Sequence, residues 1–71
     1  MSAQTIIAIV NGESREFAKG TTLGQLLADL QTPSSGVAVA KNDRVVRRST
    51  FAVEPLEDGD RVEIIKAVAG G

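Results

Sequence analysis

A single stretch of this chain has the pattern of an amphipathic helix, and that one helix limits the folds open to the chain. The stretch is TTLGQLLADLQ, residues 21–31, and its leucines recur at i, i+3, i+4 and i+7. This spacing places them on one stripe: Leu23, Leu26, Leu27 and Leu30. Thr22 and Gln25 have capping-box spacing, so we predict a helix over residues 22–31. One helix with one apolar face needs another layer of structure to bury it.

Gly24 lies in the first turn of this predicted helix. A glycine there lowers helix propensity by about 1 kcal/mol relative to alanine. We therefore expect Gly24 to allow a close approach to a neighbouring strand.

The rest of the chain is typical of strands and turns. Apolar and β-branched runs predict strands over residues 5–10, 13–17, 37–41, 44–46 and 61–68. Asn11-Gly12 is a strong hairpin signal because both residues tolerate positive φ, and Asn42-Asp43 makes a second turn. Residues 47–55 are irregular with one short helical turn around 50–53, and a type I turn containing Gly59 follows in the loop 56–60.

This order of elements predicts an α+β fold of the ubiquitin-like β-grasp type. A mixed sheet of four to five strands offers one face to the single main helix. In that arrangement the first and last strands lie side by side in the centre and run parallel, which suits their β-branched content. We predict a β-grasp domain over residues 1–68 and a flexible Gly-Gly tail over residues 69–71, disordered in the free protein.

The two central strands are apolar on both faces, although only one face can meet the helix. Alternation groups one set of side chains toward the helix: Ile6, Ala8, Val10, Val62 and Ile64. It groups the other set on the open side: Ile7, Ile9, Ile65 and Ala67. The second set is either a partner-docking patch or is covered by flanking strands and loops.

The composition excludes several classes of function. The chain has no Cys and no His, so it lacks a thiol nucleophile, the usual general base and the commonest metal ligand. A net charge of −1 argues against binding nucleic acid or anionic membranes. No apolar run is long enough to span a bilayer, and no basic segment precedes the first apolar run as in a signal peptide. We expect a cytoplasmic protein of 71 residues with little room for an enclosed active site.

The sequence finishes in KAVAGG, directly after the last predicted strand. The carboxylate of Gly71 is then the natural reactive group in a chain that has no Cys and no His. Glycine has no Cβ to shield its carbonyl carbon or to clash in a narrow channel, and its backbone adopts many conformations. Such a tail, Ala69-Gly70-Gly71, is suited to threading into an enzyme that activates its carboxylate.

Taken together, several segments resemble the ThiS family of sulfur carriers in thiamine biosynthesis, to which the small subunit of molybdopterin synthase is related. The matching segments are IVNGESREF, GTTLGQLLADL, VAVAKNDRVV and LEDGDRVEIIKAVAGG. Family members often read Asn-Gly at the middle turn, where this chain has Asn42-Asp43. This difference leaves the tail untouched.

The resemblance implies a carrier protein rather than an enzyme. A ThiF-type adenylating enzyme would activate Gly71 with ATP and Mg²⁺, and the chain itself would bind no cofactor. Sulfur relayed by a cysteine desulfurase or sulfurtransferase would then convert Gly71 to a thiocarboxylate. A ThiG-type thiazole synthase would receive that sulfur, while Gly70 and Ala69 thread the tail.

Other functions stay open from the sequence. The same chemistry could serve molybdopterin or another sulfur pathway, Gly71 could form isopeptide bonds as in a ubiquitin-like modifier, or the domain could be a binding module.

Two clusters of charged residues are candidate docking surfaces. The basic one is Lys41, Arg44, Arg47 and Arg48, and the acidic one is Glu54, Glu57, Asp58 and Asp60. Each is either a solvated loop or a surface that steers a partner by complementary charge.

Overall fold

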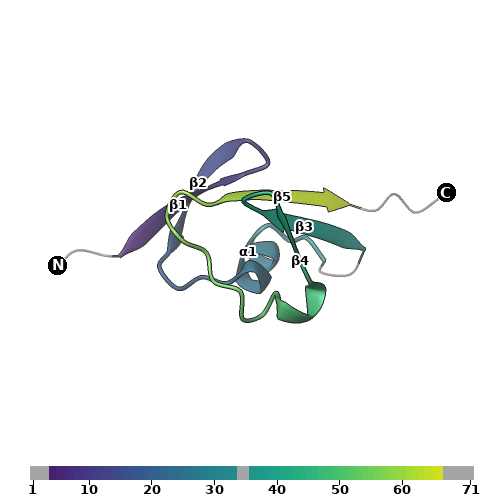
Figure 1. The fold of residues 1–71 in the computed structure, drawn as a ribbon. Helices are drawn as coiled ribbons and strands as arrows, with labels where there is room; N and C mark the ends of the chain where they lie inside the picture. Colours follow the sequence, from purple (N-terminus) through teal and green to yellow (C-terminus); the bar gives the residue numbers. More distant parts are fainter. Residues whose placement is uncertain (1–3, 34–35, 67–71) are drawn as a thin grey trace.

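Within residues 4–33 and 36–66, which the computed structural model describes, five strands form one mixed sheet in the order β2-β1-β5-β3-β4. The elements, labelled in Figure 1, are β1 (Thr5–Val10), β2 (Glu13–Ala18), α1 (Leu23–Asp29), β3 (Val37–Lys41), β4 (Arg44–Val46), a 3₁₀ helix η1 (Arg48–Thr50) and β5 (Arg61–Lys66). Helix α1 and η1 lie on the same side of the sheet (Figure 1).

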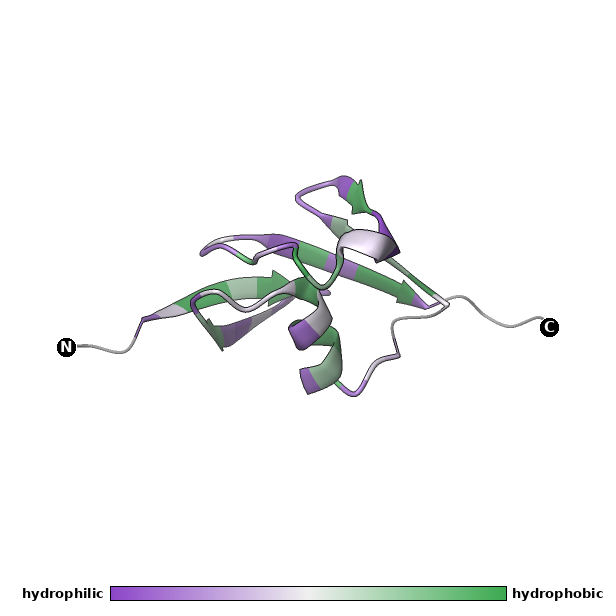
Figure 2. Cartoon of the chain, turned by 90° about the horizontal axis from the view of Figure 1, so that it is seen from below, coloured by the Kyte–Doolittle hydropathy of each residue, from purple (hydrophilic) through white to green (hydrophobic). Residues whose placement is uncertain are grey.

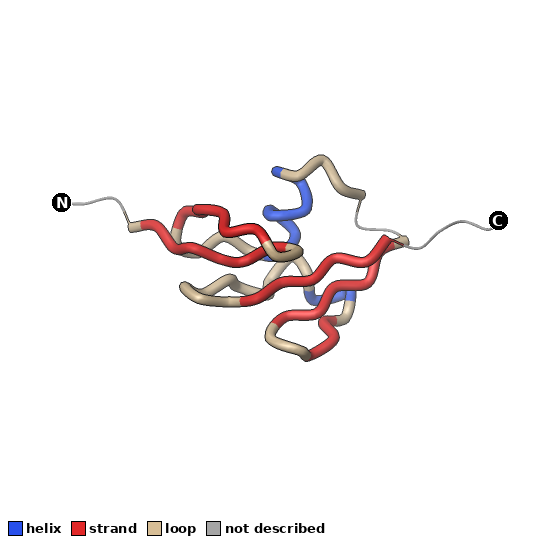
Figure 3. Tube along the Cα trace, turned by 90° about the horizontal axis from the view of Figure 1, so that it is seen from above, coloured by secondary structure: helices blue, strands red, loops and turns tan. Residues whose placement is uncertain are grey.

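The first and last strands are the central pair, as the sequence predicts. β1 and β5 run parallel with Ile9 opposite Arg61 and Val10 opposite Val62. Each forms an antiparallel pair on its other side, β1 with β2 and β5 with β3. Figure 3 shows β5 running between the β1–β2 hairpin and the β3–β4 hairpin. The predicted β-grasp arrangement is therefore confirmed.

Helix α1 begins with the predicted capping box. The Thr22 Oγ1 accepts from the Gln25 backbone N–H at 3.2 Å, and the Gln25 Oε1 accepts from the Thr22 backbone N–H at 3.0 Å. The helix ends at Asp29, two residues earlier than predicted. The reason is local, because Gln31 adopts a positive φ of 56° that a right-handed helix does not allow.

The core lies between α1 and one face of the sheet. The buried apolar residues are Ile6, Ala8, Val10, Phe17, Leu23, Leu26, Leu27, Val39, Phe51, Leu56 and Val62, and Ile64 packs against them partly buried. Hydrophobic and hydrophilic residues follow one another along β5 (Figure 2), which gives the strand one face toward this core. The predicted division of the central strands into a helix-side and an open-side set is confirmed for the described residues.

One local prediction is confirmed and extended, and another is corrected. The Thr50 carbonyl oxygen accepts from the Val53 N–H at 3.0 Å and from the Glu54 N–H at 2.8 Å, which is the predicted helical turn around 50–53. The 3₁₀ helix η1 at Arg48–Thr50 comes directly before this turn and was not predicted. Gly24 does approach another segment closely, but that segment is the chain after η1 and not a strand. A Cβ on Gly24 would lie 3.4 Å from the Ala52 Cα and 3.4 Å from the Phe51 carbonyl oxygen.

Candidate functional site

The strand β5 leads to the predicted reactive tail. Its last described residue is Lys66, and the tail residues Ala69, Gly70 and Gly71 lie outside the described residues, as does Ala67. The expected disorder of residues 69–71 also falls outside them. What the structure shows near the tail is therefore the set of contacts that fix β5, the strand that precedes it in the sequence.

Asn11 holds the outer half of β5 with its side chain. β1 ends at Val10, and the Asn11 backbone N–H donates to the Val62 carbonyl oxygen at 2.9 Å. Beyond this point the Asn11 Oδ1 accepts from the Ile64 N–H at 2.8 Å, and its Nδ2 donates to the Ile64 carbonyl oxygen at 3.4 Å. One amide side chain thus extends the ladder past the end of β1, and Asn11 tolerates the φ of 49° that this position needs.

Asp60 holds the other end of β5 and is buried. Its carboxylate accepts from the Asn42 Nδ2 at 2.9 Å and from the Glu57 backbone N–H at 2.8 Å. The Asp60 carbonyl oxygen accepts from the Ile9 N–H at 2.8 Å, which starts the β1–β5 ladder. The interpretation of the acidic cluster as a solvated loop is therefore wrong for Asp60, whose exposed fraction is 7%.

Lys41 lies beside this carboxylate. Its Nζ is 2.7 Å from the Glu54 Oε2 and 3.8 Å from the Asp60 Oδ2, and it donates to the Pro55 carbonyl oxygen at 3.0 Å. The hydrogen bond to Glu54 raises the pKa of Lys41 above its ordinary value of 10.5, against the opposing effect of burial. Lys41 is thus part of the fold, and the interpretation of the basic cluster as fully solvated is wrong for this residue.

The middle turn is also part of this network. Asn42 and Asp43 have φ of 53° and 69°, the pair of positive angles that a two-residue type I′ hairpin needs. The Asn42 Oδ1 accepts from the Arg61 N–H at 2.9 Å, so the side chain bridges the turn to β5. Asparagine at position 42 therefore serves both the turn and the strand.

The open-side residues predicted from alternation lie on one face but not in one patch. Ile7 and Ile65 are 51% and 62% exposed, and Ile9 is half-buried. Since Ile9 lies opposite Arg61 in a parallel pair, Ile65 lies six residue positions beyond Ile7 along the strand direction. At about 3.3 Å per residue this is about 20 Å. Ile7 and Ile9 are thus separated from Ile65.

A different set of residues surrounds Ile65. Ala38 lies directly opposite Ile65, and Ala40 lies opposite both Glu63 and Val45. Val45 on β4 is 82% exposed. These four residues, Ile65, Ala38, Ala40 and Val45, share the open face across three adjacent strands, and we name them the tail-proximal patch. Sequence reasoning missed Ala38, Ala40 and Val45, although alternation in the β3–β4 hairpin carries the signal.

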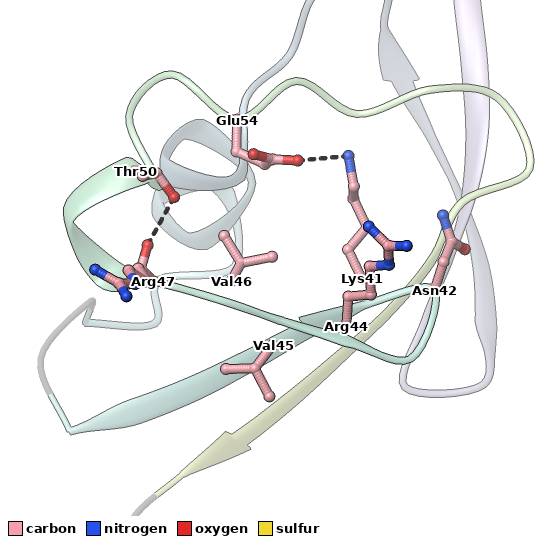
Figure 4. A pocket seen from close by; sticks show the side chains of 8 residues that line it. All are labelled: Lys41, Asn42, Arg44, Val45, Val46, Arg47, Thr50 and Glu54. Atoms are coloured by element: carbon pink, nitrogen blue, oxygen red, sulfur yellow. Dashed lines mark hydrogen bonds and ion pairs between the residues drawn. The ribbon is translucent and has the colours of Figure 1, made fainter.

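On the helix side of β4 the chain forms an open groove of about 510 Å³. It is lined by Lys41, Asn42, Arg44, Val45, Val46, Arg47, Thr50 and Glu54. Figure 4 shows Val45 and Val46 pointing to opposite sides of β4, with the Lys41 and Arg44 side chains next to each other. The ion pairs formed among the described residues include Lys41 with Glu54 but involve neither Arg44 nor Arg47.

In the described part of the chain, no three His, Cys, Asp or Glu side chains gather closely enough to hold a metal ion. None of the helices described there is long and apolar enough to cross a membrane.

Among the residues that the structure describes, the sheet order and the one α-helix that covers the sheet define a β-grasp protein. A solved structure of the thiamine biosynthesis protein ThiS from Geobacter metallireducens has the same fold, with a TM-score of 0.79 and 29% identity over 93% of this chain and 100% of that one. The model of the ThiS family matches residues 8–71, and the chain belongs to this family.

Two relatives show that similar sequences occur in proteins of different lengths. The sulfur carrier protein ThiS of Escherichia coli is 32% identical over 63 residues, which cover 89% of this chain and 96% of that protein. A thiazole synthase of Paramagnetospirillum magneticum is 38% identical over 63 residues, covering 89% of this chain. The chain spans 19% of the length of that synthase, so the match concerns one part of a larger protein.

Proposed function

We propose that this chain is a sulfur carrier protein for synthesis of the thiamine thiazole, and that it acts as a substrate of other enzymes rather than as an enzyme. The observation that carries the proposal is the ThiS family match, which extends through the Gly-Gly segment to residue 71. The β-grasp fold supports it, because its central strand β5 ends at Lys66, shortly before that segment in the sequence.

The proposed chemistry takes place on the carboxylate of Gly71. In a ThiF-type adenylating enzyme, a carboxylate oxygen attacks the α-phosphorus of Mg²⁺-bound ATP and pyrophosphate leaves. A cysteine desulfurase or sulfurtransferase relays the sulfur as a persulfide, whose terminal sulfur attacks the glycyl carbonyl carbon, and AMP leaves to give an acyl persulfide. A second thiol of the partner proteins then attacks the inner sulfur of this group, so that a disulfide forms and the Gly71 thiocarboxylate is released. The product is a thiocarboxylate, whose ionised sulfur attacks an electrophilic carbon in a ThiG-type synthase.

The residues before Gly71 have a threading role in this proposal. Gly70 has no side chain and Ala69 has only a methyl group, so the tail fits a narrow channel in an extended conformation. ATP and Mg²⁺ are held by the partner, and the chain binds no cofactor of its own. We place the protein in the cytoplasm, where ATP is available to the activating enzyme.

The thiazole pathway is preferred because a relative named thiazole synthase contains a segment similar to almost the whole of this chain. Because a segment similar to this chain occurs within that synthase, we favour a function in which this chain delivers sulfur to a thiazole synthase. Sulfur delivery to molybdopterin and lysine modification use the same activation step, and they remain alternative outcomes of the experiment below.

The tail-proximal patch is the proposed docking surface for the activating enzyme, and Ile65 is its residue on the strand that leads to the tail. An Ile65→Asp substitution changes an exposed side chain, so it is expected to lower the rate of tail activation without unfolding the domain. Ile7→Asp is the matched control, since Ile7 is similarly exposed but lies at the other end of the face. If the two variants lower the activation rate equally, the docking surface is not confined to the tail-proximal patch and includes the end of the face that carries Ile7 and Ile9.

Intact mass spectrometry tests the proposed function. The chain is incubated with ATP, Mg²⁺, a ThiF-type enzyme and a sulfur donor, and an oxygen-to-sulfur mass gain is expected on the C-terminal peptide. A variant lacking Gly71 is expected to keep its fold and to acquire no sulfur. Lysine conjugates in place of the thiocarboxylate would instead indicate a protein modifier, and sulfur uptake by the truncated variant would refute the assignment of Gly71.

A further inference from the structure

The outer edge of β4 carries main-chain groups that face away from the sheet. A two-residue turn joins β3 to β4, so Lys41 and Arg44 form the hydrogen-bonded pair that closes the hairpin. The next pair, Ala40 and Val45, is then of the non-hydrogen-bonded kind, in which main-chain groups point away from the partner strand. Since β4 is the last strand of the sheet, the N–H and C=O of Val45 point to the free edge.

This edge is positively charged on one face and apolar on the other. Arg44 is exposed, and its side chain lies on the helix side of β4 above the groove (Figure 4). Arg47 lines the same groove at the end of the strand. Glu54 neutralises Lys41 at 2.7 Å, so the charge of the two arginines is left in excess among the residues that line the groove. The exposed side chain of Val45 lies on the opposite face.

We propose that the β4 edge binds an extended acidic segment of the enzyme that activates the tail, as an added strand. The segment hydrogen-bonds to the N–H and C=O of Val45, as peptides do when they extend a sheet. Alternate side chains of an extended strand face opposite ways, so a carboxylate facing Arg44 is followed by an apolar residue facing Val45. A further carboxylate of the segment meets Arg47, just past the end of β4. This inference rests on the proposed function, since it names a second contact for the same activating partner.

The position of this edge supports one partner for both surfaces. Val45 belongs to the tail-proximal patch and also forms the free edge, so the patch and the edge are continuous. A basic edge also repels the β4 edge of a second copy, which argues against sheet pairing between copies of this chain. Charge complementarity therefore favours an acidic strand from another protein.

A charge-reversal experiment tests the electrostatic part. The double variant Arg44→Glu, Arg47→Glu is compared with Arg15→Glu, Lys19→Glu, which makes the same change in net charge on and next to β2, at the opposite edge of the sheet. Pyrophosphate release by the ThiF-type enzyme is measured against chain concentration at low and high salt. We expect the β4 variant to raise KM about tenfold at low salt, with kcat nearly unchanged, and the control to change KM less than about twofold.

A backbone variant tests the added strand itself. Val45→Pro removes an N–H that points out of the sheet, and an edge strand accepts proline at such a position. Val45→Ala keeps this N–H while shortening the side chain, so it is the matched control. We expect Val45→Pro to raise KM several-fold above Val45→Ala, with similar urea midpoints for the two variants.

The outcomes separate the two proposals. If the wild-type chain is not activated at all, the proposed function fails. If the wild type is activated but the β4 and β2 reversals have equal effects, only the acidic partner strand is refuted. Equal KM values for Val45→Pro and Val45→Ala likewise refute strand addition. If Arg44→Glu, Arg47→Glu fails to fold, the milder Arg44→Gln, Arg47→Gln pair is measured in its place against Arg15→Gln, Lys19→Gln.

Discussion

Replacing Asp60 by alanine is expected to remove a large part of the stability of this domain. The substitution deletes the acceptors of two short hydrogen bonds, from the Asn42 Nδ2 at 2.9 Å and from the Glu57 N–H at 2.8 Å. Hydrogen bonds to a charged group contribute about 1.5–3 kcal/mol each. Asn42 and Glu57 are exposed, so water replaces part of what they lose, and the lower end of that range applies.

The expected loss is therefore about 3 kcal/mol of unfolding free energy. A chain of 71 residues has a total of about 4–10 kcal/mol, so the loss is a large fraction. Lys41 keeps its closer partner Glu54 at 2.7 Å, and we therefore add no separate cost for an unpaired lysine.

Urea unfolding followed by circular dichroism measures this loss. With a slope of about 1 kcal/mol per molar urea for a small domain, the midpoint should fall by about 3 M. Glu13→Ala is the control, because it also removes one acidic side chain, and its ion pair with Arg15 is exposed to solvent. If the two variants differ by less than about 1 kcal/mol, the Asp60 network does not stabilise the fold as argued.

Three further predictions concern other named contacts. Asn11→Ala should lower the free energy of unfolding by about 2 kcal/mol, because it removes a 2.8 Å hydrogen bond and alanine disfavours the positive φ of this position. Amide hydrogen exchange at Ile64 should become faster, and an unchanged exchange rate would contradict the role given to Asn11. The pKa of Lys41 is raised above its ordinary value of 10.5, so the charged lysine stabilises the fold fully below pH 10.5 and this contribution is lost as the pH rises through the folded-state pKa. Urea midpoints should therefore fall more steeply in alkali for the wild type than for Lys41→Met. Gly24→Ala should raise the thermal midpoint slightly, since its methyl group meets neighbours at 3.4 Å and helix propensity improves by up to about 1 kcal/mol, whereas the larger Gly24→Val should lower it.

The parts of the fold that follow from local chemistry were predictable from the sequence. The capping box of Thr22 and Gln25, the Asn11-Gly12 turn and the leucine stripe each depend on residues within one or two turns of chain. The alternation of the central strands likewise separates Ile6 from Ile7 without knowledge of their neighbours. These signals are sufficient to predict the order of the helix and strands and to predict which face of the sheet packs against the helix.

The contacts that hold β5 were not predictable in the same way. The Asn11–Ile64 contact joins residues 53 positions apart, and the Asn42–Asp60 contact joins residues 18 positions apart. Both depend on strand register, which is set by the packing of the whole sheet. The same register separates Ile7 from Ile65, so a patch inferred from alternation alone combined two distant sites.

The two side chains that hold β5 act at opposite ends of the strand, and this difference has a functional consequence. At its start β5 has β1 on one side and β3 on the other, whereas beyond Val62 it keeps β3 and the Asn11 side chain. Lys66 lies opposite Val37 at a position where main-chain groups face away from β3, on the side that β1 no longer reaches. The strand therefore passes from two-sided to one-sided support over a few residues as it approaches the segment that contains Gly71. Substitutions at Asp60 should for this reason act on the stability of the whole domain, whereas substitutions at Asn11 should act more on how firmly β5 holds the base of the tail.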